Sequence, residues 1–99
     1  MYVTMHGSWN RQPAIGYKLI EIPFKKLDTG LYDPVAAADS KTSWKDIMYA
    51  PNAGSCSSMS LTRSTCMRLA AVAWSPDYST LFVSSDNDAE GEVWVLTKA

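Results

Sequence analysis

Apolar and polar side chains alternate along most of this chain of 99 residues. A period of two is typical of β-strands, because successive side chains of a strand point to opposite faces of a sheet. The strands that this pattern predicts are residues 2–6, 16–24, 43–51, 68–74, 80–85 and 92–97. Residues 27–34 are expected to form a loop, residues 34–39 resemble a short helical turn, and residues 52–65 have the composition of a loop.

The last third of the chain carries the clearest pattern. The apolar segment RLAAVAW (68–74) is followed by the turn SPDYS, the strand TLFVSS, a second polar turn and the strand EVWVLT. Three short strands joined by polar turns form an antiparallel meander. An alanine-rich strand followed by strands with aromatic residues and valines is typical of a β-propeller blade, whose innermost strand is crowded near the axis.

A lone blade leaves both faces of its sheet uncovered, whereas in a propeller the neighbouring blades cover them. At four strands per blade, the strands of this chain make about one and a half blades. We therefore expect an all-β protein that forms part of a β-propeller. Met1 and Tyr2 are then expected to lie in a strand whose upstream partners belong to a longer protein.

Composition narrows the class of protein. The chain is 46% hydrophobic and 19% charged with a net charge of -1, which argues for an ordered domain and gives no basic surface for nucleic acid or an anionic membrane. No apolar run approaches the ~20 residues that cross a bilayer, and the N-terminal residues do not read as a secretion signal. Cys56 and Cys66 form either a disulfide or two separate thiols, and with one distant histidine they do not provide four zinc ligands.

Two segments resemble one known family. YVTMHGSWNRQPAIGYKLIEIPF (2–24) and CMRLAAVAWSPDYSTLFVSSDNDAEGEVWVL (66–96) closely resemble the C-terminal end of the soluble quinoprotein glucose/sorbosone dehydrogenases. The most similar members look like the sorbosone and pyranose dehydrogenases that depend on pyrroloquinoline quinone (PQQ). The hexapeptide HGSWNR (6–11) is the most specific part of the match.

The resemblance implies a six-bladed β-propeller that binds PQQ and calcium on its axis and oxidises a sugar by hydride transfer from the anomeric carbon to the quinone. It implies that residues 1–51 belong to the penultimate blade, that 52–67 form a loop and that 68–97 form the last blade. The catalytic base, a histidine, and most calcium ligands would come from earlier blades. The chain is therefore expected to contain no catalytic residue and no metal ligand.

PQQ is a flat quinone with three carboxylates, which favour guanidinium groups and flat side chains as partners. Arg68 occupies the position of the family's cofactor-binding arginine, with a salt bridge at the rim as the alternative. Arg11 is a second candidate, or it braces its loop by bonding to carbonyl groups. His6 is a candidate cofactor-side or substrate-side contact, and Trp9 and Asn10 are candidate ligand contacts, although each of the three is also compatible with a structural role.

Two further features take their interpretation from the family. A disulfide between Cys56 and Cys66 is implied, because a cysteine pair recurs before the arginine strand. Residues 86–91 (DNDAEG) resemble the start of an EF-hand loop, but Thr97 stands where the bidentate glutamate would be, and strands flank the loop, so a hairpin turn is favoured.

Two functional hypotheses remain at this stage. In the first, the chain is the C-terminal part of a PQQ-dependent sugar dehydrogenase that is secreted or periplasmic, uses an external electron acceptor and is inactive in isolation. In the second, it is a non-catalytic propeller fragment that mediates protein contacts through exposed sheet edges.

Overall fold

The computed structural model describes residues 1–8, 11, 13–56, 66–86 and 91–98. Within these residues the chain is built of β-strands and one short 3₁₀ helix, which confirms the all-β prediction. The elements in chain order are β1 (Tyr2–Met5), β2 (Lys18–Glu21), β3 (Phe24–Lys26), β4 (Tyr32–Pro34), β5 (Lys45–Tyr49), η1 (Ala53–Ser55), β6 (Leu69–Trp74), β7 (Thr80–Ser85) and β8 (Glu92–Thr97). No described segment forms a helix that is long and apolar enough to span a membrane.

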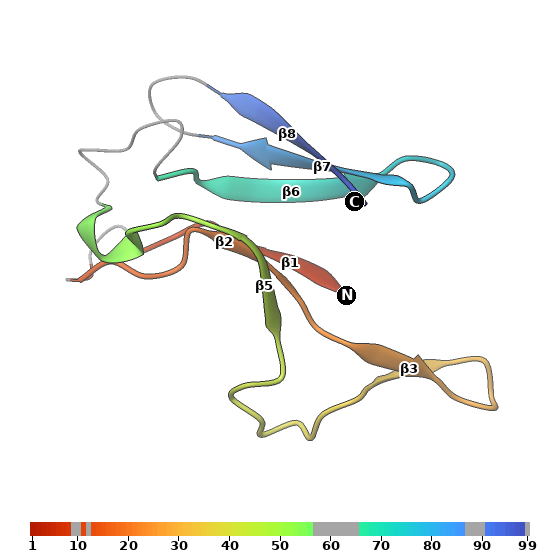
Figure 1. Ribbon diagram of the computed structural model, residues 1–99. Coiled ribbons are helices and arrows are strands. Elements are labelled where there is room, and N and C mark those ends of the chain that lie inside the picture. The colour runs from red at the N-terminus through yellow and green to blue at the C-terminus, as the bar shows by residue number, and fades with distance from the viewer. Residues whose placement is uncertain (9–10, 12, 57–65, 87–90, 99) are drawn as a thin grey trace.

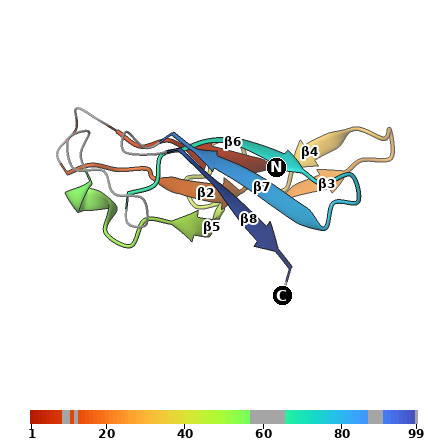
Figure 2. The same cartoon turned by 90° about the horizontal axis from the view of Figure 1, so that it is seen from above.

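The strands form two larger antiparallel sheets and one hairpin (Figure 1). The first sheet has the order β1-β2-β5, and the second is the meander β6-β7-β8 predicted from the sequence. The hairpin β3–β4 projects away from the two sheets (Figure 1). Seen from above, the second sheet lies over the first (Figure 2), an arrangement consistent with two neighbouring blades of a partial propeller.

One apolar core joins the two sheets. Its buried members come from β2, β6 and β7 and from the segment just before β6: Leu19, Met67, Leu69, Leu81 and Val83. Strand β1 lies against β6, where the Thr4 hydroxyl donates a hydrogen bond to the carbonyl oxygen of Ala70 at 3.3 Å. Because each sheet has one apolar face, stacking the sheets removes both faces from water together.

A smaller core lies at the end of the first sheet where β2 begins and β5 ends. It contains Ala14, Tyr17, Ala50 and the two cysteines. A disulfide joins Cys56 to Cys66, whose Cα atoms are 5.7 Å apart. The backbone N–H of Ala50 donates to the carbonyl oxygen of Tyr17 at 2.9 Å, so this cluster fixes the chain at the point where it enters β2.

The middle of the chain differs from the sequence prediction. The expected loop 27–34 contains β4, which pairs with β3, and residues 34–39 form no helical turn. The predicted strand 16–24 is divided into β2 and β3, and each larger sheet has three described strands rather than four. Every residue of β3 and β4 is exposed, so the hairpin lacks the alternation of buried and exposed positions by which strands are recognised.

Candidate functional site

Three chain segments meet at one end of the interface between the sheets. His6 follows β1, Arg68 precedes β6, and Asp86 follows β7. The backbone holds Arg68 from two sides, because its N–H donates to Ser85 Oγ at 3.0 Å and its carbonyl oxygen accepts the N–H of Asp86 at 3.0 Å. Two segments of the second sheet and one of the first thus bring their side chains together.

We call His6, Arg68 and Asp86 the polar cluster. His6 Nε2 lies 2.7 Å from Asp86 Oδ1, and Arg68 Nε lies 3.7 Å from the same oxygen. The side chains of His6 and Arg68 are 37% and 22% exposed, so both are accessible to a ligand while partly shielded from solvent. One carboxylate therefore neutralises the guanidinium and orients the imidazole.

A tight contact between two turns fixes the chain directly after His6. Gly7 has φ of 110°, and a Cβ atom built on it would lie 2.5 Å from the ring of Tyr17. Tyr17 is itself buried in the left-handed region with φ of 56°. Only glycine fits at position 7, because both the backbone angle and the neighbouring ring exclude a side chain.

Ser8 is held by three hydrogen bonds to Ile15 and Tyr17. Its N–H donates to the carbonyl oxygen of Ile15 at 2.9 Å, its Oγ accepts the N–H of Ile15 at 2.9 Å, and its carbonyl oxygen accepts the Tyr17 hydroxyl at 2.6 Å. Gly7 and Ser8 of the HGSWNR segment therefore have structural roles that determine where His6 lies. Tyr17, which contacts Gly7, is part of the smaller core that contains the disulfide.

Of the other candidates from the sequence, the structure describes only Arg11, which is not part of the polar cluster. Arg11 is exposed, and its Nη1 donates to the carbonyl oxygen of Pro13 at 2.9 Å, which is the loop-bracing contact given above as the alternative. Trp9 and Asn10 lie outside the described residues. Arg68 forms an ion pair with Asp86, which is the salt bridge expected as the alternative to cofactor binding. Because His6 contacts the same oxygen of Asp86, the guanidinium and the imidazole lie near each other.

Asp86 was not predicted as a site residue, because in the sequence it is only the first residue of the turn 86–91. Its position opposite Arg68 depends on the register of the strands. Val72 pairs with Val83 and Trp74 with Leu81, but the register shifts by one between Leu69 and Ala71. Without this bulge, the residue after Asp86 would lie opposite Arg68, and a bulge of one residue is not readable from alternation alone.

No group of three or more histidine, cysteine, aspartate or glutamate side chains able to hold a metal ion occurs among the described residues. Residues 87–90 of the EF-hand-like segment lie outside them. The described part of the chain thus provides no cluster of carboxylates for calcium.

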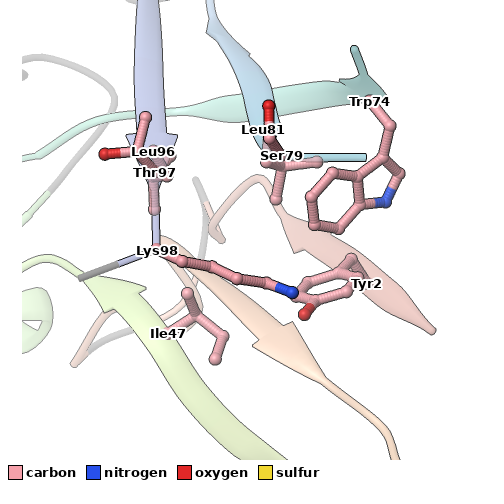
Figure 3. Close-up of a pocket in the computed structure, with 8 residues that line it drawn as sticks. All are labelled: Tyr2, Ile47, Trp74, Ser79, Leu81, Leu96, Thr97 and Lys98. Atoms are coloured by element: carbon pink, nitrogen blue, oxygen red, sulfur yellow. The ribbon is translucent and has the colours of Figure 1, made fainter. Parts of the chain in front are cut away.

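The opposite end of the same interface is aromatic. A pocket of about 140 Å³ opens there between the sheets (Figure 3) and is lined by Tyr2, Ile47, Trp74, Ser79, Leu81, Leu96, Thr97 and Lys98. The rings of Tyr2 and Trp74 meet edge to face, with centroids 5.3 Å apart at 77°. The Tyr2 hydroxyl donates to Glu21 Oε2 at 2.9 Å, and this hydrogen bond, with some burial, raises the pKa of the phenol.

Two antiparallel sheets packed on one core are consistent with a segment of a β-propeller. A family model, described as TrAA12-like, matches residues 1–99. The chain therefore belongs to the TrAA12-like family.

Named relatives of this chain agree with this assignment. Two curated sequences from Coprinopsis cinerea, both named pyrroloquinoline quinone-dependent pyranose dehydrogenase, are each 38% identical over 99 residues, which is 99% of this chain and 13% of the relative. A solved structure, the holo form of the pyranose dehydrogenase PQQ domain from the same fungus, aligns with a TM-score of 0.81 and 39% identity over 98% of this chain and 23% of that chain. The chain thus spans a small part of these relatives.

Proposed function

We propose that this chain forms part of a PQQ-dependent dehydrogenase that oxidises pyranose or related sugars at the anomeric carbon. The observation that carries the proposal is the polar cluster, in which Arg68 lies beside His6 at one end of the sheet interface. The relatives named as PQQ-dependent pyranose dehydrogenases support the choice of cofactor and substrate class.

The polar cluster suits an anionic quinone. Arg68 provides a guanidinium whose planar fork matches a carboxylate, and its backbone hydrogen bonds to Ser85 and Asp86 fix where the residue lies at the end of the interface. When bound, PQQ supplies a quinone carbonyl that accepts a hydride from the sugar. Arg68 would bind one carboxylate of the cofactor, and His6 would contact the cofactor or the sugar beside it. Arg11, Trp9 and Asn10 remain further candidate contacts from the same loop.

The two sheets support a division into blades. We assign residues 1–51 to an incomplete penultimate blade, 52–67 to a connecting loop and 68–97 to the last blade. The outward face of the second sheet is exposed and apolar, with Phe82, Val93 and Val95 exposed by 40%, 66% and 59%. A neighbouring sheet of the complete protein would cover this face, as blades do in a propeller.

The disulfide between Cys56 and Cys66 supports a secreted or periplasmic protein, because disulfides persist in oxidising compartments. Re-oxidation of the cofactor would then require an external electron acceptor. Calcium would be held by residues other than those described for this chain.

The test is PQQ-dependent dye reduction by the full natural protein, freed of cofactor and then supplied with PQQ and calcium. We expect activity with D-glucose or another pyranose only after PQQ is added. The 99-residue chain alone is expected to be inactive, because it spans 13% of the length of its curated relatives. If the full protein neither binds PQQ nor reduces the dye with any of a panel of pyranoses, the proposed function is wrong. In that case the non-catalytic hypothesis would replace it.

A further inference from the structure

The contact between His6 and Asp86 determines which imidazole nitrogen carries the proton. An ionised carboxylate only accepts hydrogen bonds, so at 2.7 Å from Asp86 Oδ1 the Nε2 atom of His6 must be the donor. In a neutral imidazole with a proton on Nε2, the other nitrogen, Nδ1, carries the lone pair. In the neutral ring, Asp86 therefore makes Nδ1 of His6 a hydrogen-bond acceptor.

The accepting nitrogen is open to a ligand. Nδ1 makes no hydrogen bond to any residue that the structure describes, and the His6 side chain is 37% exposed. Gly7, the residue directly after His6, lies close against the Tyr17 ring, and Nε2 is paired with Asp86, so the imidazole is held in place before a ligand arrives. A preorganised acceptor of this kind selects ligands that donate.

PQQ and the sugar, the two ligands of the proposed enzyme, differ in their hydrogen-bonding groups. Apart from one pyrrole N–H, the polar groups at the edge of PQQ are carboxylates and carbonyls, which are acceptors and match Arg68, which only donates. The hydroxyl groups of a sugar can donate to Nδ1. We infer that His6 is a substrate-side residue that accepts a hydrogen bond from a sugar hydroxyl, and that Asp86 is the positioning residue that gives His6 this role.

This inference rests on the proposed function for the identity of the ligand, but the state of His6 is measurable without cofactor. The ring nitrogens of His6 are observed by ¹⁵N NMR at pH 8 in the full protein free of PQQ, with the signals assigned by their loss in His6→Gln. We expect the Nε2–H tautomer in the wild-type protein. In Asp86→Asn the side-chain amide is also able to donate to Nε2, so we expect a mixture of tautomers.

Kinetics separate positioning from a general loss of structure. In Asp86→Asn we expect KM for the sugar to rise about tenfold with little change in kcat, as for the loss of a binding contact. Binding of PQQ is expected to be no weaker than in the wild type, because Arg68 loses a competing carboxylate. Asp77→Asn, the same substitution at the other turn bounded by β7, is the matched control and should change neither KM nor the His6 signals.

Each outcome decides the inference. An Nδ1–H tautomer in the wild type, or an unchanged sugar KM in Asp86→Asn, overturns it. Equal weakening of PQQ and sugar binding also overturns it, because that pattern marks a structural role. If the wild-type protein binds no PQQ, the proposed function fails, and D-glucose titration of the His6 Nδ1 signal decides the inference alone: a saturable shift supports it and the absence of a shift refutes it.

Discussion

The polar end and the aromatic end of the sheet interface are made by the same strands but have opposite chemistry. Strand β1 carries Tyr2 at its start and is followed by His6, whereas β6 is preceded by Arg68 and ends with Trp74. Asp86 follows β7 at the polar end. The aromatic end is held by ring contacts and the polar end by a shared carboxylate.

This difference suggests that the aromatic end contributes mainly to stability and the polar end mainly to binding. Aromatic pairs contribute about 0.5–1.5 kcal/mol beyond the area they bury, which suits a region that holds the sheets together. Partly exposed charges contribute little to stability, and the role proposed for the polar cluster is binding. Substitutions at the polar end should therefore weaken binding, and substitutions at the aromatic end should lower stability. Gly7 is the exception, because it lies next to the polar end but is expected to affect stability.

The largest expected effect is on stability and comes from that loop. Gly7→Ala places a methyl group 2.5 Å from the buried Tyr17 ring at a backbone angle that disfavours alanine. We expect a loss of about 3 kcal/mol in the free energy of unfolding, from strain and overpacking together. Denaturant unfolding of the natural protein measures it.

Gly30→Ala is the matched control for this prediction. Gly30 also has positive φ, at 86°, but a Cβ atom there meets nothing within 4 Å. The cost should be about 1 kcal/mol, which is the conformational part alone. Equal losses in the two variants would mean that the contact between Gly7 and Tyr17 is not what fixes the polar end.

The second effect is on binding at the polar end. Arg68→Ala should weaken PQQ binding about 30-fold, which corresponds to about 2 kcal/mol for charged hydrogen bonds. The free energy of unfolding should change by less than about 1 kcal/mol. Equilibrium titration of the cofactor-free protein with PQQ gives the affinity.

Lys26→Ala removes the same charge from the projecting hairpin and should leave the affinity for PQQ unchanged. If both variants bind PQQ equally, the guanidinium of Arg68 has no specific role and the comparison between the two ends fails.

A smaller effect is expected at the aromatic end. Tyr2→Phe keeps the edge-to-face contact with Trp74 but removes the hydrogen bond to Glu21. We expect about 1 kcal/mol less stability and unchanged binding of PQQ. A weaker affinity for PQQ in this variant would show that the two ends are coupled, against the separation proposed here.

The smallest effect concerns acid stability at the turn between β6 and β7. Hydrogen bonds from the Ser75 hydroxyl, and from the hydroxyl and N–H of Ser79, lower the pKa of Asp77 from 3.8 to about 2. The folded state therefore favours the charged carboxylate, which stabilises the fold above about pH 4, and this contribution is lost as the pH falls from about 4 to about 2. NMR titration of the Asp77 carboxyl measures the shift directly.

Asp77→Asn should remove this part of the acid dependence while leaving the rest of the unfolding curve unchanged. A carboxyl that titrates at its ordinary pKa of 3.8 in the folded protein would refute the assignment.

The meander β6-β7-β8 could be read from the sequence because its core and its turns follow simple rules. The buried Leu81 and Val83 alternate with less buried neighbours, and proline and aspartate mark the turn that precedes them. The hairpin β3–β4 could not be predicted, because its residues are exposed on both faces and give no alternation.

The site was only partly predictable for a different reason. His6 and Arg68 came from a resemblance, and nothing in their spacing showed that the two sheets bring them together. Asp86 depends on a one-residue bulge, and local residue patterns do not determine register at such a point. The role of Gly7 follows from a contact with the Tyr17 ring, which only the folded chain shows.

The most direct test of the central claim is a crystal structure of the complete protein with PQQ bound. We expect a carboxylate of the cofactor at hydrogen-bonding distance, about 3 Å, from the Arg68 guanidinium, with His6 beside it and still paired to Asp86. A cofactor bound elsewhere, with Arg68 contacting only Asp86, would contradict the account.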